Sequence, residues 1–245
     1  MLHRHRVVCS VFVLGLCASP SWAGKRKSHG VPASIILNGK KTSVVWTDGD
    51  SFKVESGPHS GAGSRLMGFN TLEAYGPVHR WGTWTAAELF ALAKSSAAVA
   101  ASQEWTCTTN GELDGYKRLL VNCPDLAVEM VKAGHALAYV VDQDTAAPAV
   151  LAAQAQAMKD KRGMWAKGAV KGVVTSVHSV GEDGGHGATA YNRVVDTRTG
   201  KAAMVEHAKT YQSCQEVCVD VEGETSCLVY VPFNTRYKNQ PACLK

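Results

Sequence analysis

The sequence "RLMGFNTLE", residues 65–73, decides how this chain is interpreted. An arginine opens a short apolar run, which ends in the polar residues Asn70, Thr71 and Glu73. Upstream, the sequence "DGDSF" at 48–52 places two aspartates on either side of a glycine. A cation, a carboxylate pair and a further carboxylate therefore occur close to strand-like segments. Such residues together can bind a hard metal ion and a phosphate group.

Strand geometry restricts how these side chains can meet. Asp48 and Asp50 share one face of a strand by the period of two, unless the glycine between them bulges the chain. Taken alone, D-G-D is more typical of a turn. Arg65 and Asn70 are an odd number of residues apart and would face opposite sides of a straight strand. We therefore expect the strand to end or bulge near Gly68.

The flanking sequence predicts a small barrel covered by helices. Residues 34–54 contain three strand-like runs separated by turn residues, and 84–101 has helical composition. A hairpin follows, then a short helix from Pro124 that is capped by Gly134, an apolar strand, and an alanine-rich helix that ends at Gly163. This order fits an α+β protein in which about three helices pack against an antiparallel barrel, and it does not fit alternating βα units.

The first residues have the three parts of a secretory signal peptide. Basic residues precede an apolar run from Val7 to Ala18, and small residues lead to a predicted cleavage site near Ala23. The apolar run is too short to anchor the protein in a membrane, and no later segment resembles a membrane span. We therefore expect residues 1–23 to be removed and the protein to be secreted, or to reside in the periplasm or cell envelope.

The charge of the remaining chain is only mildly basic. Two of the 26 lysines and arginines, Arg4 and Arg6, lie in the predicted leader, which leaves 24 against 21 acidic residues and a net charge of +3. This balance permits a polyanionic partner without requiring one.

Cysteine usage agrees with export. Six cysteines remain after removal of the leader, and an even number of cysteines in an exported chain indicates disulfides. Cys107 and Cys123 lie in two strand-like runs joined by a polar turn, so we expect a bridge between them. The other four are expected to pair among themselves: Cys214, Cys218, Cys227 and Cys243. A structural zinc site is the alternative, although the spacing lacks paired C-x2-C knuckles.

The character of the sequence changes at about Lys167. Residues 167–245 contain short strand-like runs, Gly/Asp turns and the last four cysteines, and we predict a small β-rich extension stapled by disulfides. Within it, "YVPFNTRYKNQ" combines aromatic residues with Arg236 and Lys238 and could contact nucleic acid. A strand end followed by a polar loop is the simpler interpretation. No catalytic motif is recognised in this extension.

Several motifs occur together in the order and spacing of a known family. "DGDSF" is similar to a D-G-D-[ST]-hydrophobic strand, "RLMGFNTLE" to an R-L-x-G-[IV]-D-x-P-E segment, and "DGYKR" at 114–118 to a D-x-Y-G-R turn. "VEMVKAGHALAYV" and "RGMW" are similar to the family's closing segments. From about Thr42 to Trp165 the chain resembles the staphylococcal-nuclease-like thermonucleases. The resemblance implies a five-stranded OB-fold barrel at 34–166 and Ca²⁺-dependent hydrolysis of DNA and RNA.

The resemblance also implies a metal site. Asp50, the side chain of Asn70 and the backbone carbonyl of Thr71 would bind Ca²⁺, with Asp48 as an acid behind them. Hard oxygen ligands of this kind suit Ca²⁺.

The remaining roles concern the substrate. By the same resemblance, Arg65 and Arg118 would hold the scissile phosphate, and Glu73 would activate or orient the attacking water. Tyr116 would line the nucleotide pocket, and Tyr139 would stand near the base or sugar. These roles agree with general chemistry, since fork-shaped arginines match phosphate oxygens and a carboxylate near a water can act as a general base.

Three positions depart from the family pattern. Asn70 stands where most members have a second Ca²⁺-binding carboxylate, so one formal charge is lost and weaker Ca²⁺ binding is expected. Leu72 replaces a proline before Glu73, and Lys117 replaces a glycine before Arg118.

The leading interpretation is a secreted, Ca²⁺-dependent endonuclease of the thermonuclease type, which acts on DNA or RNA as a monomer. A catalytically weak or inactive OB-fold module that binds nucleic acid is the first alternative. The second is an envelope interaction protein that works through its C-terminal extension.

Overall fold

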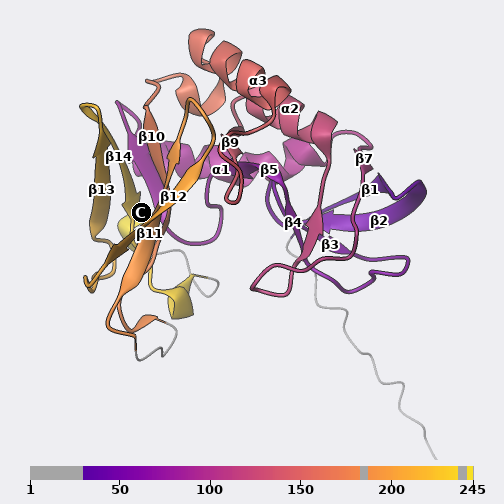
Figure 1. Ribbon diagram of the computed structural model, residues 1–245, viewed down its shortest axis with the longest axis horizontal. Coiled ribbons are helices and arrows are strands. Elements are labelled where there is room, and N and C mark those ends of the chain that lie inside the picture. Colours follow the sequence, from indigo (N-terminus) through magenta and orange to yellow (C-terminus); the bar gives the residue numbers. More distant parts are fainter. Residues whose placement is uncertain (1–29, 183–186, 237–241, 245) are drawn as a thin grey trace, which may run out of the picture.

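The computed structural model describes residues 30–182, 187–236 and 242–244 of the chain (Figure 1). The predicted signal peptide and its cleavage site lie outside these residues. The fold is mixed α and β. The strands as far as residue 139 are β1 (Val31–Leu37), β2 (Lys40–Trp46), β3 (Phe52–Val54), β4 (Ser64–Leu66), β5 (Gly68–Thr71), β6 (Val78–Trp81), β7 (Thr106–Cys107), β8 (Leu119–Val121) and β9 (Ala136–Tyr139).

Three α-helices accompany these strands, as expected. They are α1 (Ala86–Ala100), α2 (Pro124–Lys132) and α3 (Pro148–Lys159), and a short 3-10 turn, η1 (Gly163–Trp165), follows α3. The N-cap of α1 is Thr85, whose hydroxyl accepts from the Glu88 N–H while the Glu88 carboxylate accepts from the Thr85 N–H. This capping box satisfies backbone donors that the first helical turn leaves unpaired. Helix α2 begins at Pro124 and is followed by Gly134 at φ +72°, as the sequence predicts.

The strands curl around a common core in several short ladders. β1, β2 and β3 pair antiparallel, and so do β5 and β9. β7 pairs parallel with β1, and β8 pairs parallel with β4, so the purely antiparallel barrel expected from the sequence is only partly observed. The predicted hairpin between β7 and β8 is reduced to two isolated antiparallel bridges, Thr108 to Asn122 and Leu113 to Leu119. The strands themselves pair with β1 and β4, which precede them in the chain. Among the described residues the ladders are separate rather than one continuous five-stranded ladder.

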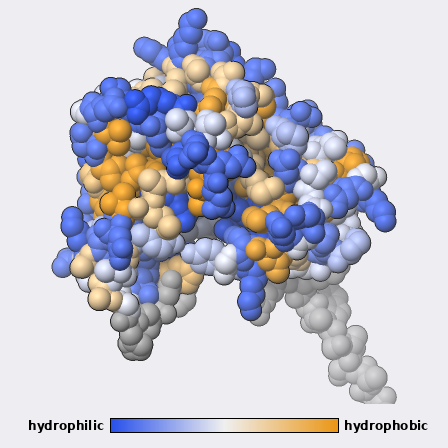
Figure 2. All heavy atoms as spheres, viewed as in Figure 1, coloured by the Kyte–Doolittle hydropathy of each residue, from blue (hydrophilic) through white to orange (hydrophobic). Residues whose placement is uncertain are grey.

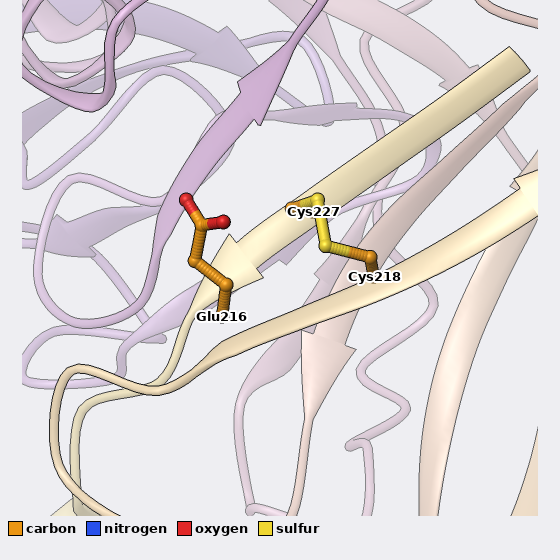
Figure 3. Close-up of side chains that lie close together, drawn as sticks. All are labelled: Glu216, Cys218 and Cys227. Atoms are coloured by element: carbon orange, nitrogen blue, oxygen red, sulfur yellow. A yellow bond between two sulfur atoms is a disulfide. The ribbon is translucent and has the colours of Figure 1, made fainter.

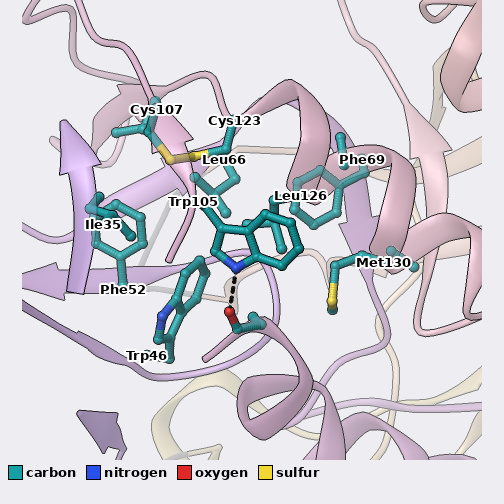
Figure 4. Packing of buried hydrophobic residues seen from close by; sticks show 14 of the residues in the cluster. Ile35, Trp46, Phe52, Leu66, Phe69, Trp105, Cys107, Cys123, Leu126 and Met130 are labelled. Carbon is teal, nitrogen blue, oxygen red and sulfur yellow. Dashed lines mark hydrogen bonds between the residues drawn. A yellow bond between two sulfur atoms is a disulfide. The ribbon is translucent and has the colours of Figure 1, made fainter. Parts of the chain in front are cut away.

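Large apolar side chains fill the space between these strands and α2 (Figure 4). Trp46 and Phe52 meet edge to face with ring centroids 5.0 Å apart. Nearby, the Trp105 indole N–H donates to the Ala100 carbonyl at 2.6 Å, so this buried polar group is satisfied. The predicted Cys107–Cys123 disulfide is present and borders the same core. Each large apolar side chain buried here contributes about 1.5–3 kcal/mol to stability.

The C-terminal extension is β-rich, as predicted, and contains two sheets. Its strands are β10 (Gly172–Val177), β11 (Ala190–Asp196), β12 (Ala202–His207), β13 (Glu216–Val221) and β14 (Glu224–Val229), followed by the 3-10 turns η3 (Phe233–Thr235) and η4 (Ala242–Leu244). β10, β11 and β12 form one sheet. β13 and β14 form the other together with β6, a strand that the sequence analysis did not predict.

The extension shares a core with the rest of the chain and lies beside α1 (Figure 1). Trp81 of β6 packs near Trp165, with ring centroids 6.0 Å apart, and the same cluster includes Leu89 of α1, Val173 of β10 and Val195 of β11. This arrangement holds the extension against the strands and helices that carry the candidate site.

The four cysteines of the extension pair among themselves, as expected. Cys218 bonds Cys227 across the β13–β14 hairpin, and Cys214 bonds Cys243 of η4. Within the described ranges, no helix has the length and hydrophobicity needed to cross a bilayer.

The buried His79 of β6 is expected to make the fold sensitive to acid. It is 1% exposed, and in the described part of the chain neither ring nitrogen has a hydrogen-bond partner. Burial lowers its pKa to about 3. Between pH 6.5 and pH 3 the unfolded chain therefore binds a proton that the folded chain does not. The free energy of unfolding should fall with decreasing pH in this window, by up to roughly 1.4 kcal/mol per pH unit from this residue.

The measurement is urea unfolding of the natural protein and His79→Leu between pH 7 and pH 4. We expect the variant to lose stability less steeply as the pH falls. His59→Leu, in the loop after β3, is the matched control and should keep the natural slope. Equal slopes for all three proteins would contradict the assignment.

Candidate active site

The Asp48–Asp50 segment is a turn between β2 and β3, so the strand face that these aspartates were expected to share does not exist. The backbone N–H of Asp50 donates to Asp48 Oδ1 at 3.2 Å. Gly49 leaves no room for a side chain, because a Cβ there would lie 2.6 Å from Thr71 Cγ2 and 2.7 Å from Met130 Cε. The glycine thus lets the turn press against β5 and α2, and it carries Asp50 into the interior.

The chain breaks direction between β4 and β5, as the spacing of Arg65 and Asn70 required. β4 ends at Leu66 and β5 begins at Gly68, whose φ of +88° is favourable only for glycine. Because the chain changes direction here, the alternation of a straight strand no longer applies. The side chains of Arg65 and Asn70 therefore point into the same cluster.

Arg65 lies at the centre of this cluster. Its Nη1 pairs with Asp50 Oδ2 at 2.8 Å, and its Nη2 donates to Asn70 Oδ1. The guanidinium carbon lies 5.7 Å from the centre of the Tyr139 ring. The Asp50 side chain is only 4% exposed, so this ion pair is largely shielded from solvent on its acidic side.

Asn70 and Thr71 complete the network from β5, which β9 holds in register. The Asn70 side-chain amide donates to the Thr71 carbonyl at 2.7 Å, and the Thr71 N–H donates to Asp50 Oδ2 at 2.8 Å. The Ser51 hydroxyl donates to the other oxygen, Asp50 Oδ1, at 3.1 Å. The three oxygen groups named as Ca²⁺ ligands therefore belong to one hydrogen-bonded cluster.

Arg118 reaches the site from the residue before β8. In the parallel β4–β8 ladder Ser64 is paired with Leu119. Arg65 follows Ser64 and Arg118 precedes Leu119, so both arginine side chains project from the face opposite to that pair. Asp114 fixes Arg118 in place, because its Oδ2 accepts from Nε at 2.8 Å and contacts Nη2 at 2.6 Å. The exposed Tyr116 lies near the guanidinium, 5.4 Å from ring centre to Cζ.

Glu73 follows β5 and carries a strongly perturbed carboxyl group. Burial and the charge of Asp50 raise its pKa to about 7, against the opposing charges of Arg65, Arg236 and Arg118. Burial and the neighbouring Asp50 also raise the pKa of Asp48 well above its usual range. Such perturbed acids in a cleft are characteristic of functional sites.

These groups surround a single cavity of about 920 Å³. The lining includes six residues predicted from the sequence: Asp48, Asp50, Arg65, Thr71, Glu73 and Arg118. Asn70 and Tyr139 contact Arg65 from outside the lining. The lining also includes residues that the sequence analysis did not assign: Tyr75, Gly76, Phe90, Lys94, Arg236 and Leu244. The sequence signal for Arg236 is the aromatic and basic segment "YVPFNTRYKNQ".

The donor set is compatible with Ca²⁺. The carboxylate of Asp50, the amide oxygen of Asn70 and the carbonyl of Thr71 are hard oxygens held close together, and Asp48 supplies a further carboxylate. Arg65 donates to two of these three groups. An ion bound by them would therefore compete with the Arg65 guanidinium, which could then turn towards a substrate phosphate.

A second acid and sulfur cluster in the extension is structural. Glu216, Cys218 and Cys227 lie close together on β13 and β14 (Figure 3). Both sulfur atoms form the Cys218–Cys227 disulfide, and the Glu216 carboxylate pairs with the Arg80 guanidinium at 2.6 Å. The zinc alternative considered for these cysteines is therefore excluded for this pair, since a metal ligand must be a free thiolate.

Comparison with known proteins agrees with this geometry. The sequence model of a family described as staphylococcal nuclease homologue matches residues 64–167. Residues 64–167 are therefore similar to the staphylococcal nuclease homologue family. The match covers β4, β5, all three helices and both arginines, whereas the Asp48–Asp50 turn precedes it and the extension follows it. No curated protein matches the chain.

Proposed function

We propose that this protein is a Ca²⁺-dependent nuclease that hydrolyses phosphodiester bonds of DNA or RNA. The observation that carries the proposal is the convergence of Arg65, Arg118 and Glu73 on one cavity beside a cluster of oxygen ligands. The family match supports a nuclease or a nucleic-acid-binding function for residues 64–167.

Arg65 and Arg118 would hold the scissile phosphate. They leave the same side of the β4–β8 ladder, and Asp114 fixes the orientation of Arg118. Guanidinium groups can each donate two hydrogen bonds to phosphoryl oxygens, and they oppose the negative charge that builds there during hydrolysis.

Glu73 would take the proton of the attacking water or orient that water. Its pKa of about 7 suits a general base near neutral pH, because a base works best when its pKa lies close to the working pH.

Asp50, Asn70 and the Thr71 carbonyl would hold Ca²⁺, with Asp48 behind them. The ion, when bound, would neutralise negative charge on the phosphoryl oxygens. Asp50 would be held in place by the Thr71 N–H and the Ser51 hydroxyl.

We further propose that the nuclease unit spans 34–166, forms a five-stranded OB barrel and acts as a secreted or periplasmic monomer. The predicted leader and three disulfides support an oxidising compartment.

A nucleic-acid-binding module without hydrolysis is the second candidate, and one observation favours it. Arg65, Asp50, Asn70 and Thr71 already satisfy one another by hydrogen bonds, so an ion must displace Arg65 to bind. If Ca²⁺ binds too weakly to do so, the arginines would still attract a polyanion.

The substitution Asn70→Asp separates these two functions. An aspartate adds a charge and cannot donate to the Thr71 carbonyl, which is then available to the ion. We expect the Ca²⁺ concentration at half-maximal hydrolysis of single-stranded DNA to fall at least about tenfold.

The control is Asn110→Asp, which adds the same charge at an exposed position and keeps the hydrogen bond from the Glu112 N–H. It should leave the Ca²⁺ dependence unchanged. Absence of hydrolysis in the natural protein and in Asn70→Asp at every Ca²⁺ concentration would reject the nuclease and favour the binding module.

A further inference from the structure

The cavity continues beyond the residues assigned so far to a second pair of cations. Lys94 of α1 and Arg236, the residue after η3, line it together with Tyr75, Phe90 and Leu244. No family motif in the sequence includes these residues. Arg236 and Leu244 belong to the C-terminal extension, outside the segment matched by the family. Figure 2 shows a hydrophilic, recessed surface where the extension faces the strands of the other half.

Aromatic rings hold Lys94 in position. Its ammonium nitrogen lies 3.6 Å from the centre of the Tyr75 ring and 5.4 Å from that of Phe90. A cation over ring faces is attracted to them without losing its charge. The residue is exposed, so the ammonium group remains accessible to a ligand in the cavity.

Arg236 is fixed by the extension rather than by the nuclease segment. Its Nε donates to the Val231 carbonyl at 2.9 Å, and its Nη2 donates to Glu182 Oε1 at 3.0 Å. Its aliphatic part rests on Gly76, where a Cβ would lie only 3.0 Å from Arg236 Cδ. The missing side chain at Gly76 therefore allows the extension to place a guanidinium at the cavity.

The two cation pairs border one space. Arg65 and Arg118 come from the β4–β8 ladder, whereas Lys94 and Arg236 come from α1 and the extension. The charges of Arg236, Arg65 and Arg118 all act on Glu73, which places them around the same carboxylate. A nucleic-acid strand carries one charge per nucleotide, so a bound strand presents further phosphates beside the one that is cleaved.

We propose that Lys94 and Arg236 form a subsite for a backbone phosphate that flanks the scissile phosphate, so that the C-terminal extension completes the substrate cleft. This proposal rests on the proposed nuclease function. It assigns the extension a role in binding longer strands, which the nuclease segment alone would not provide.

The test compares two substrates: a dinucleotide, which has only the scissile phosphate, and a single-stranded octanucleotide. The variants are Lys94→Met, which keeps the contact with the rings, and Arg236→Gln, which removes the guanidinium charge. We expect kcat/KM for the octanucleotide to fall about tenfold in Lys94→Met, as for loss of a charge-assisted hydrogen bond, while kcat/KM for the dinucleotide is unchanged. In Arg236→Gln we expect kcat/KM to fall about tenfold more for the octanucleotide than for the dinucleotide, because the charge of Arg236 also acts on Glu73 and its loss affects both substrates. Arg198→Gln is the control, because Arg198 is exposed on the same extension and pairs with Asp196 and Glu222.

An equal fall for both substrates, or no fall for the octanucleotide, would overturn the subsite. Equilibrium binding of the octanucleotide without Ca²⁺ tests the subsite even if the natural protein cleaves nothing. In that measurement Lys94→Met should weaken binding about tenfold and lower the slope of log K against log[salt] by about 0.7. Unchanged binding and slope would reject the subsite, whereas changed binding without any cleavage would reject only the nuclease.

Discussion

Replacement of Arg65 by alanine is expected to reduce kcat at least about 100-fold and to destabilise the fold at the same time. The activity falls because a guanidinium that opposes the charge developing on the phosphate is removed. The stability falls because Asp50, which is 3% exposed, loses the cation that pairs with its Oδ2 at 2.8 Å. An unpaired buried carboxylate costs about 3–5 kcal/mol. Single-turnover hydrolysis and urea unfolding measure the two effects.

Two further variants separate catalysis from folding. Arg65→Ala combined with Asp50→Asn removes the buried charge, so it should recover much of the lost stability without recovering activity. Arg162→Ala is the control, since Arg162 pairs with Asp160 at the surface and its loss should change stability by less than about 1 kcal/mol. Near-natural activity in a folded Arg65→Ala protein would refute the role of Arg65 in hydrolysis.

Glu73→Gln is expected to lower kcat by about 10²–10⁴-fold while leaving the protein as stable as before, or more stable. The amide has nearly the shape of the carboxylate but cannot accept a proton from water. It also carries no charge, whereas the ionised carboxylate is disfavoured by burial and by Asp50. This pattern is opposite to that of Arg65→Ala, for which activity and stability fall together.

The measurement is kcat under saturating substrate and Ca²⁺, alongside thermal unfolding. Glu129→Gln is the matched control, because Glu129 is an exposed residue of α2 that pairs with Lys132 at 3.4 Å. It should retain both activity and stability. Full activity in Glu73→Gln would mean that another group positions the water.

Local sequence signals determined much of the fold. Helix α1 followed from the helical composition of residues 84–101, and Pro124 and Gly134 bound α2 as predicted. These signals act within one or two turns, so no distant residue is needed to interpret them. The Cys107–Cys123 bridge was predictable for a similar reason, since the two strand-like runs are close in the chain.

Distant pairing explains what local signals missed. β6 was not predicted, because Val78–Trp81 becomes a strand through pairing with β14, nearly 150 residues later. The hairpin around Cys107 was predicted as a ladder, but β7 and β8 pair with β1 and β4 instead. Pairing partners depend on which strand edges the rest of the fold leaves open, and that information is not local.

For the candidate site, the sequence by itself determined which residue types are available. It placed Asp50, Arg65, Glu73 and Arg118 in recognisable motifs, and the odd spacing of Arg65 and Asn70 already required the break that Gly68 provides. These inferences hold because motif spacing and backbone periodicity are properties of the chain.

Only the tertiary structure decided what surrounds those residues. It packed Gly49 against Thr71, linked Arg65 to both Asp50 and Asn70, and placed Arg236 beside Gly76. The pKa of Glu73 likewise depends on burial and on charges from distant segments. Burial, ion pairing and cavity shape are set by groups far apart in the chain, so no reading of a short motif could supply them.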